Sequence, residues 1–326
     1  MIQLKSSPAR ESQSARLSLA ARRRSDKLAQ WLFFVFSVIP VGLAIVILAL
    51  LIYKSWPIMK VQSVWQLLSG QVWKPDDGLF GFWPFITGTI WVTLAALLIS
   101  VPPCVLTAIY LSEYAGRSLR RIMKPLLDLL AAIPSVVYGV WGMLVIVPFI
   151  QNKLGSFIRE YLPNLPLLKS DNPTGFGILA GAIVLAIMIA PFIIAVLYEI
   201  MNNIPRGLKE ASLALGTTKL QTVQWVVIPQ VLSGIIAGIG LGASRALGET
   251  MAVLMVVGNV AHVPHSLLDA AYPLPALIAN NYGEMMSIPL YDSALMTAAL
   301  ILMVIILIFN VTSALVLQRV LGRRDT

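Results

Sequence analysis

The sequence has little charge and almost no cysteine. Of its 326 residues only 12% are charged, about half the share that is usual in soluble domains, whereas 58% are hydrophobic and the mean hydropathy is +0.82. This composition excludes an ordinary soluble globule and indicates that lipid surrounds most of the chain. Cys104 is the one cysteine, which excludes a disulfide within the chain and a two-thiol redox or zinc pair.

Motifs that would carry enzymatic chemistry are also missing. The chain contains no Gly-Lys pair, so it lacks a phosphate-cradling loop of the nucleotide-binding kind, and it has no His-Glu-x-x-His zinc helix. His262 and His265 flank Pro264 in a loop, but no third ligand accompanies them, so we interpret them as a solvated pair without a metal. The sequence therefore predicts a chain that is not an enzyme and has no catalytic residue, metal or cofactor of its own.

Long apolar runs dominate what is present. A helix needs about 20 apolar residues to cross the hydrocarbon core of a bilayer. The first run is longer than the core of a signal peptide and has no small-residue cleavage site after it, so we expect a retained span. The runs predict an all-α integral membrane protein with six transmembrane helices at approximately 31–53, 84–111, 125–150, 176–198, 227–257 and 293–318.

The positive charges lie mostly on alternate sides of these runs. Seventeen of the 24 Lys and Arg fall in four segments: 1–30, 112–124, 199–226 and 319–326. Such a bias predicts that both termini are cytoplasmic. The net charge of +9 is then a topology signal and not a nucleic-acid surface. The expected organisation is a cytoplasmic tail 1–30, a first transmembrane helix 31–53, a periplasmic loop 54–83, a transmembrane domain 84–318 and a cytoplasmic tail 319–326.

Two connecting segments carry simple local signals. Residues 1–30 are rich in Ser, Arg and Ala, which predicts a disordered or surface-lying tail. Residues 151–175 contain Pro163, Pro166 and Pro173, which predict a loop ordered by turns and not by a long helix.

The fifth apolar run contains charge. Gly234, Gly238 and Gly242 recur every four residues, a pattern that allows two membrane helices to approach closely. At 100° per residue, Arg245 and Glu249 fall on the same stripe of a continuous helix. This stripe cannot face lipid, because an arginine in the middle of a span costs about 2.5–3.5 kcal/mol even on the most lenient insertion scale.

Two interpretations of Arg245 and Glu249 follow. The first is a structural ion pair between residues one helical turn apart that holds neighbouring helices. The second, which we favour, is a substrate path in which Arg245 meets an anion. A guanidinium group suits a tetrahedral oxyanion because it donates two parallel hydrogen bonds and stays charged.

Weaker candidates for the same path lie in other spans. Pro134 interrupts the third run, and Ser135 and Tyr138 follow it at a helical spacing. Thr89 and Thr93 in the second run are candidates of the same rank. Ordinary helix–helix hydrogen bonding is the alternative for all four side chains. Asp128 is expected at the membrane surface, where a carboxylate needs no special role.

The loop 199–226 predicts a helical elbow. Residues 204–216 read as a short helix with Pro205 in its first turn and Gly216 as a left-handed stop. Thr217 or Thr218 then offers a cap for a second helix that runs to Pro229.

These residues carry a family resemblance. Glu210-Ala211-Ser212, then Gly216, then Ile228-Pro229 resemble the EAA loop of the permeases of ABC importers. The resemblance implies that Glu210, Ala211 and Gly216 belong to a coupling loop that docks on an ATP-hydrolysing subunit. The sequence departs from the pattern at Ser212, where Ala is usual, and at Val226, where Ile is common.

Four further motifs narrow the resemblance to the PstC-type permeases of phosphate-specific ABC importers. They are Arg245–Val253, Ala132–Gly139, Phe85–Thr89 and Ala186–Pro191. The resemblance covers residues 80–257 with specific motifs, and it departs at Ala243-Ser244, where Leu-Gly is frequent.

The resemblance implies a type I ABC importer fold in the bacterial inner membrane and import of inorganic phosphate. The implied partners are a PstA-type permease in a heterodimer, two copies of a PstB-type ATPase and a periplasmic PstS-type phosphate-binding protein. ATP and Mg²⁺ would be bound by the ATPase, which would supply the energy.

Other transport functions stay open at this point. A permease of the same class could carry another oxyanion such as sulfate or molybdate, because an arginine fork does not distinguish tetrahedral anions. A secondary transporter could use Glu249 or Asp128 as a proton carrier, although we find no inverted repeat in the sequence. An intramembrane enzyme is disfavoured, since no nucleophile–base pair is apparent.

Overall fold

The fold is described from a computed structural model that places residues 8–161, 166–168, 172–283 and 288–322. Residues 1–7 and 323–326, which belong to the two expected tails, lie outside the described residues, as does Pro163. The chain divides into two compact units, Met1–Tyr53 and Lys54–Thr326, which are described separately.

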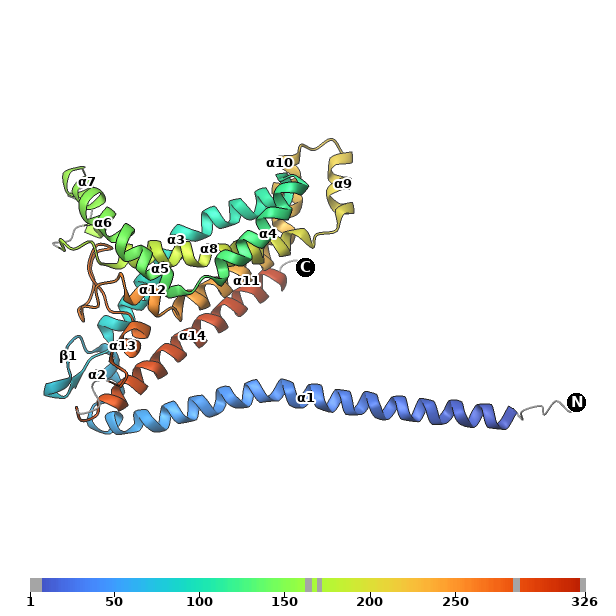
Figure 1. The fold of residues 1–326 in the computed structure, drawn as a ribbon, viewed down its shortest axis with the longest axis horizontal. Helices are drawn as coiled ribbons and strands as arrows, with labels where there is room; N and C mark the ends of the chain where they lie inside the picture. The colour runs from blue at the N-terminus through green and yellow to red at the C-terminus, as the bar shows by residue number, and fades with distance from the viewer. Residues whose placement is uncertain (1–7, 162–165, 169–171, 284–287, 323–326) are drawn as a thin grey trace, which may run out of the picture. The chain divides into compact units, whose positions relative to one another are not determined.

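The first unit contains most of helix α1 (Pro8–Val61), whose last residues belong to the second unit (Figure 1). The helix begins before residue 31, so the expected disordered tail is helical from Pro8 onwards. Its Ala, Arg and Leu residues are strong helix formers, which explains the continuation. The candidate span within this helix is Asp26–Val61, and its apolar side chains, such as those of Trp31 and Phe33, are exposed.

The second unit holds the other five of the six candidate spans found in the described part of the chain. The all-α membrane fold predicted from the sequence is thereby confirmed. In the order of the chain these spans are Trp83–Tyr114, Ser135–Ile158, Ile178–Asn202, Lys219–Leu247 and Tyr291–Arg319. The main helices that form them are α3 (Trp83–Ile109), α5 (Ser135–Trp141), α8 (Ile178–Asn202), α11 (Ile228–Leu247) and α14 (Tyr291–Gly322).

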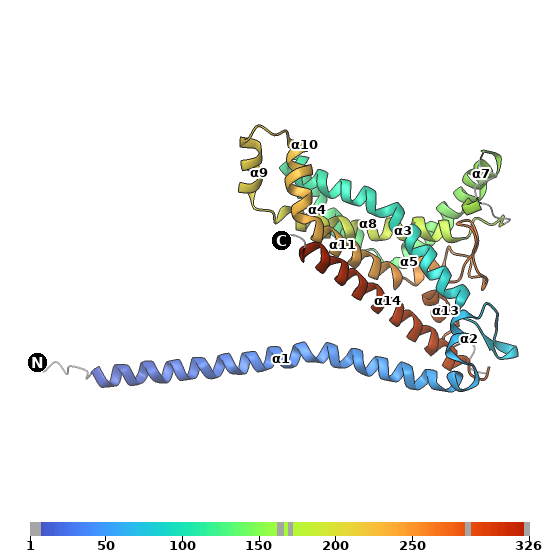
Figure 2. The same cartoon turned by 180° about the vertical axis from the view of Figure 1, so that it is seen from behind.

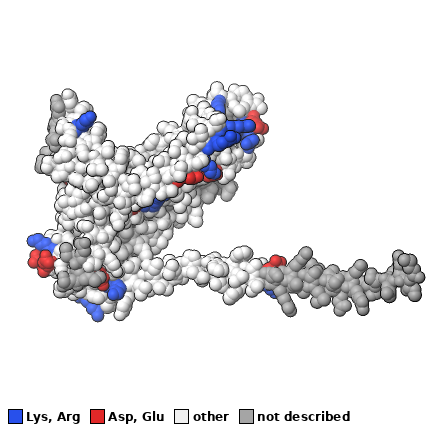
Figure 3. All heavy atoms as spheres, viewed as in Figure 1, with Lys and Arg blue, Asp and Glu red and all other residues white. Residues whose placement is uncertain are grey.

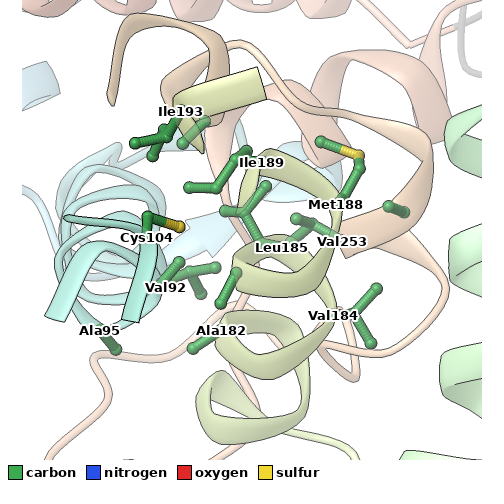
Figure 4. Close-up of a cluster of buried hydrophobic side chains, with 14 of the residues drawn as sticks. Val92, Ala95, Cys104, Ala182, Val184, Leu185, Met188, Ile189, Ile193 and Val253 are labelled. Carbon is green, nitrogen blue, oxygen red and sulfur yellow. The ribbon is translucent and has the colours of Figure 1, made fainter. Parts of the chain in front are cut away.

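The core of this unit lies around α8, which packs along α3 and α11 (Figures 1 and 2). Figure 4 shows the contact between α3 and α8, where Val92 and Cys104 meet Leu185 and Ile189. Alanines such as Ala96 and Ala182 are fully buried there, and their small side chains let the two helices approach closely.

The third span differs from the prediction of a helix over 125–150. Helix α4 (Arg117–Ala132) ends before Pro134, and α5 starts a new helix after it. Because α4 carries four basic residues, it is amphipathic and the candidate span starts only at Ser135. Helical structure then continues through η3 (Gly142–Ile146), α6 (Val147–Phe149), η4 (Ile150–Leu154) and α7 (Gly155–Tyr161).

The expectation that residues 151–175 form turns is therefore wrong for the first part of this segment. No proline occurs between Gln151 and Tyr161 to stop the helix. A short 3-10 turn, η5 (Pro166–Leu168), is described further along.

The fifth span is also interrupted. It starts with α10 (Lys219–Thr222) and the π-helical turn η6 (Val223–Val227), continues as α11 and breaks at Gly248–Thr250 before α12 (Met251–Leu254). The prediction of one continuous helix over 227–257 is wrong at this break, which displaces Glu249 from the helix that carries Arg245.

The segments between spans hold structure that the sequence analysis does not predict. One is a small hairpin of β1 (Trp73–Lys74) and β2 (Leu79–Phe80), which pair antiparallel with Trp73 opposite Phe80 around the 3-10 turn η1 (Pro75–Asp77). An aromatic cluster holds it in place: Trp73, Phe80, Phe82, Phe85 and Tyr291. Two short helices, α2 (Val64–Ser69) and α13 (Leu274–Asn281), lie at the same end of the unit (Figure 1).

Charge is segregated on the surface of this unit. Figure 3 shows Lys and Arg gathered at the end where α9 (Arg206–Ala214) and α10 lie, and a second group of charges at the end with the hairpin. The surface between the two ends is mostly uncharged, as expected for helices that cross a membrane.

Candidate functional site

Arg245 lies in the last turn of α11 and is half-buried. Its Nη2 donates a hydrogen bond to the carbonyl oxygen of Ala131 at 3.4 Å, and its guanidinium carbon lies 5.2 Å from the centre of the Phe192 ring. The side chain thus connects α11 with the end of α4 and with the middle of α8.

The break at Pro134 explains why an arginine is stable at this position. The last carbonyls of α4 have no partner within their own helix, and a helix carries partial negative charge at this end. Tyr138 Oη donates to the carbonyl oxygen of Leu130 at 2.9 Å, and Arg245 donates to the carbonyl oxygen of Ala131. Tyr138 and Arg245 therefore cap the same helix end, and the cation complements its dipole.

Glu249 has a different partner from the one that the helical spacing predicts. It lies in the break after α11, and its Oε1 accepts a hydrogen bond from the backbone nitrogen of Ala252 at 3.1 Å. Among the described residues, the ion pairs are Lys54–Asp292, Lys124–Glu199 and Lys209–Glu113, so Arg245 and Glu249 do not pair. The interpretation of Arg245 and Glu249 as a structural ion pair is therefore wrong, and each side chain instead makes its own capping contact.

The arrangement around Arg245 leaves it able to bind an anion. A guanidinium has five N–H donors, and one of them is used by Ala131 in a long contact. Stacking on Phe192 holds the plane of the group without using its donors.

The weaker candidates separate into different roles. Thr89 Oγ1 donates to the carbonyl oxygen of Phe85 at 2.7 Å and accepts from the nitrogen of Leu274 at 2.9 Å, so it joins α3 to α13. Thr93 is buried in α3, and Ser135 is half-buried at the start of α5, one turn from Tyr138. Thr89 thus has a structural contact, and Tyr138 is the candidate that shares the end of α4 with Arg245.

Asp128 is exposed on α4 beside a mostly apolar groove of about 380 Å³ between α4 and α8. Lys124 crosses this groove to Glu199, with 2.5 Å between Nζ and Oε1. The hydrogen bond with Glu199 raises the pKa of Lys124, so that the cation is stabilised there. His262 and His265 are both exposed.

The glycine stripe of α11 faces α8. A Cβ atom added at Gly234 would lie 2.5 Å from Ile200, and one at Gly242 would lie 2.6 Å from Ile193. At Gly238 the nearest atom would be Leu197 Cδ2, at 2.9 Å. The close helix approach predicted from the stripe is therefore confirmed, and the contact lies within this chain.

The elbow follows the sequence prediction closely. Helix α9 (Arg206–Ala214) starts after Pro205, and Gly216 has a left-handed backbone with φ of +83°. Thr218 caps α10, since its Oγ1 accepts from the nitrogen of Gln221 while the Gln221 side chain accepts from the Thr218 nitrogen.

The outer surface of the elbow is apolar as well as charged. Glu210 and Ala211 are exposed on α9, and Leu215 is 85% exposed directly before Gly216. Exposed leucines surround them: Leu208, Leu213 and Leu220. Such a patch on a tip of the molecule indicates a surface that a partner covers.

A hydroxyl cluster inside the elbow escaped the sequence analysis. Ser212 Oγ lies 2.8 Å from Thr217 Oγ1 and 3.1 Å from Thr222 Oγ1, and Thr217 also donates to the Ser212 carbonyl. The sequence does carry a signal for this cluster, because serine stands at position 212 where the family usually has alanine. A serine on a buried face of a helix needs a hydrogen-bond partner. Phe192, which stacks on Arg245, had no comparable signal.

Helices long and apolar enough to cross a membrane, with a helical elbow between two of them, are typical of a membrane transport subunit. The chain belongs to the family of binding-protein-dependent transport system inner membrane components, which it matches over residues 104–324. The resemblance to PstC-type permeases is confirmed by relatives described below.

Two such relatives are named phosphate transport system permease protein PstC. The one from Xylella fastidiosa strain 9a5c is 39% identical over 256 residues, which cover 78% of each chain. The one from Pasteurella multocida is 37% identical over 273 residues, covering 83% of this chain and 84% of the relative. A probable ABC transporter permease from Bacillus subtilis, YqgH, is 35% identical over 75% of this chain and 74% of its own length.

Solved structures confirm the fold of an ABC importer permease. A chain of the inward-facing MetNI methionine ABC transporter superposes with a TM-score of 0.52 and 21% sequence identity, covering 74% of this chain and 94% of that chain. A second crystal form of the same transporter gives a TM-score of 0.51.

Proposed function

We propose that this chain is the permease subunit that imports inorganic phosphate in an ABC importer. The observation that carries the proposal is the similarity to several PstC permeases, at 36–39% identity over most of the chain. The half-buried Arg245 adds support, since it offers hydrogen-bond donors and positive charge to an oxyanion.

In the proposed transport step, Arg245 binds phosphate at the level of the break between α11 and α12. Its contact with the Ala131 carbonyl is long, at 3.4 Å, so that an anion can compete for the guanidinium. Glu249 then acts from within the break, where its negative charge disfavours a long stay of the anion.

The proposed energy source is ATP hydrolysis in a partner. Moving one negative charge inward against about 100 mV costs about 2.3 kcal/mol, and a dianion costs twice as much, so a passive pore would lose phosphate. The chain has no nucleotide-binding loop in its sequence. The exposed apolar surface of the elbow at Glu210, Ala211 and Leu215 is the proposed docking site of a PstB-type ATPase, which binds ATP and Mg²⁺.

The proposed assembly contains a PstA-type permease as the second half of the membrane channel and two PstB-type ATPases. A PstS-type protein delivers phosphate on the periplasmic side. The distribution of Lys and Arg supports cytoplasmic termini and a cytoplasmic elbow in the bacterial inner membrane.

Substitution of Arg245 tests this function. In purified complex reconstituted into vesicles, we expect Arg245→Gln to abolish phosphate uptake while the complex still assembles, because glutamine keeps a polar amide in α11 but lacks the charge and the planar fork of arginine. Arg245→Lys should also be impaired, since an ammonium lacks the planar fork. Glu249→Gln should slow turnover more than it prevents phosphate entry.

The double variant Arg245→Gln, Glu249→Gln separates the anion role from a purely structural one. An active double variant would contradict anion binding at Arg245, and assembly measured in parallel identifies variants that merely misfold. Competition of phosphate uptake by sulfate and molybdate identifies the oxyanion. Uptake that depends on a proton gradient and not on ATP would contradict the proposed class.

A further inference from the structure

A buried ion pair joins the elbow to the inner end of α3. Lys209 Nζ in α9 lies 2.6 Å from Glu113 Oε1, in the π-helical turn η2 (Tyr110–Tyr114) that ends α3. The Glu113 side chain is only 9% exposed and that of Lys209 20%. The other ion pairs of the described residues are much more exposed, with 42–60% of each side chain accessible.

Two neighbours of Glu113 also contact this region. The Nζ of Lys219 in α10 lies 4.9 Å from the centre of the Tyr114 ring. On the other side, Ser112 Oγ lies 3.6 Å from Met201 Sδ at the end of α8. The three consecutive residues Ser112, Glu113 and Tyr114, which we call the elbow seat, therefore contact the helix before the elbow and both helices within it.

The chain connectivity shows why such contacts matter. Helix α9 follows α8 after three residues, and α10 continues through η6 into α11, so a displacement of the elbow pulls directly on α8 and α11. Helix α3 is distant in sequence, since Glu113 and Lys209 are 96 residues apart. At this end, α3 can move with the elbow only through noncovalent contacts between them.

The turn that carries the elbow seat is one of four π-helical turns among the described residues. In η2 the backbone is wound as a π-helix, and it closes with a hydrogen bond from the Ala115 nitrogen to the Tyr110 carbonyl. Single π-helical turns are uncommon and frequently occur at functional sites. Here the turn ends α3 at the residues that contact the elbow.

We propose that Glu113 and Lys209 are positioning residues that transmit movement of the elbow to α3, with Tyr114 and Lys219 as a second link. The proposal rests on the proposed coupling of the elbow to an ATPase. A mostly buried pair suits this task better than an exposed one, because separating it removes the ionic partner of the Glu113 carboxylate, which is only 9% exposed to water and keeps only the Ser112 hydroxyl beside it. Helix α3 in turn contacts α13 through Thr89 and Leu274 at its other end, so the link reaches across the span.

The test uses the complete transporter with its ATPase and partner permease, purified and reconstituted into phospholipid vesicles. Phosphate uptake and ATP hydrolysis are measured on the same preparation for the double neutral variant Glu113→Gln, Lys209→Met. We expect phosphate imported per ATP hydrolysed to fall about tenfold, since a hydrogen bond to a charged group shifts an equilibrium by about that factor. The charge-swapped variant Glu113→Lys, Lys209→Glu should recover most of the ratio.

The matched control is the exposed pair Lys124–Glu199, which joins α4 to α8 and does not touch the elbow. The double variant Lys124→Met, Glu199→Gln should leave the ratio of uptake to hydrolysis unchanged. A role limited to stability would lower complex yield, uptake and hydrolysis together, without changing this ratio.

Each result decides the proposal. An unchanged ratio in the double neutral variant, or an equal fall in the control, overturns it. If the Glu113 and Lys209 variants do not assemble, Tyr114→Leu and Lys219→Met at the exposed second link are judged by the same ratio. A wild-type complex without an ATPase overturns both proposals, whereas wild-type transport of another oxyanion overturns only phosphate, and the ratio is then measured with that anion.

Discussion

For Arg245, the surrounding sequence predicts burial but not the residues that it contacts. The cost of a mid-span arginine predicts that the side chain is shielded from lipid, and the structure places it against Ala131 and Phe192. These partners come from α4 and α8, so no local pattern indicates them. Glu249 was assigned to the same stripe because a continuous helix was assumed, and the break at Gly248 makes it a cap of α12.

Thr89 gives a prediction at the same scale. Thr89→Val removes the hydroxyl that accepts from the buried nitrogen of Leu274, so we expect the free energy of unfolding to fall by about 1–3 kcal/mol. The measurement is the thermal unfolding midpoint of the solubilised protein. Thr89→Ser keeps the hydroxyl and serves as the matched control. Equal stability of the Val and Ser variants would contradict the structural role and return Thr89 to the list of path residues.

At the scale of elements, the elbow was predictable because its signals are local. Pro205 starts α9, Gly216 has the left-handed backbone that glycine favours, and Thr218 caps α10. The break between α4 and α5 was indicated by Pro134, but the extension of helical structure to Tyr161 was not. Only the second half of α4 is apolar, and the four basic residues of its first half distinguish it from a span.

The packing of α11 on α8 gives the prediction for elements. Gly242→Ala would place a methyl group 2.6 Å from Ile193, which is fully buried, so we expect overpacking to cost about 1–3 kcal/mol. The midpoint of thermal unfolding and the yield of folded protein measure this. Gly42→Ala in α1 is the matched control, because nothing lies within 4 Å of its added Cβ and alanine favours a helix. If both variants behave alike, the stripe does not pack as described.

At the scale of the whole molecule, hydropathy predicts the number of spans, which the six candidate spans of the described residues confirm, whereas the direction that charge predicts for them stays a prediction. Both depend on sums over many residues, so errors at individual helix ends do not alter them. The hairpin of β1 and β2 and the helix α13 were not predicted, since their stability comes from an aromatic cluster assembled from distant segments.

The expected orientation gives a prediction for the intact chain. Leu215→Cys, at the elbow, should react with a membrane-impermeant thiol reagent only from the cytoplasmic side. Asp77→Cys, at the exposed turn of the hairpin, should react only from the periplasmic side. Labelling of intact cells against inverted vesicles measures this, and the wild type is the blank because Cys104 is 1% exposed. Labelling of both positions from the same side would contradict this topology, and exchange of the two sides would reverse it.

The hydroxyl cluster of Ser212, Thr217 and Thr222 has a consequence for engineering. All three side chains lie within the bend between α9 and α10 that their hydrogen bonds stabilise. The shape of this bend therefore does not require contacts with the rest of the permease. A chimera in which residues 210–222 replace the equivalent segment of another permease should therefore keep the shape of the loop. Only the outward side chains, and the anchoring lysine at position 209, would need to be adapted to the host. Such a loop could be transplanted to change which ATPase drives a permease while the transported substrate stays the same.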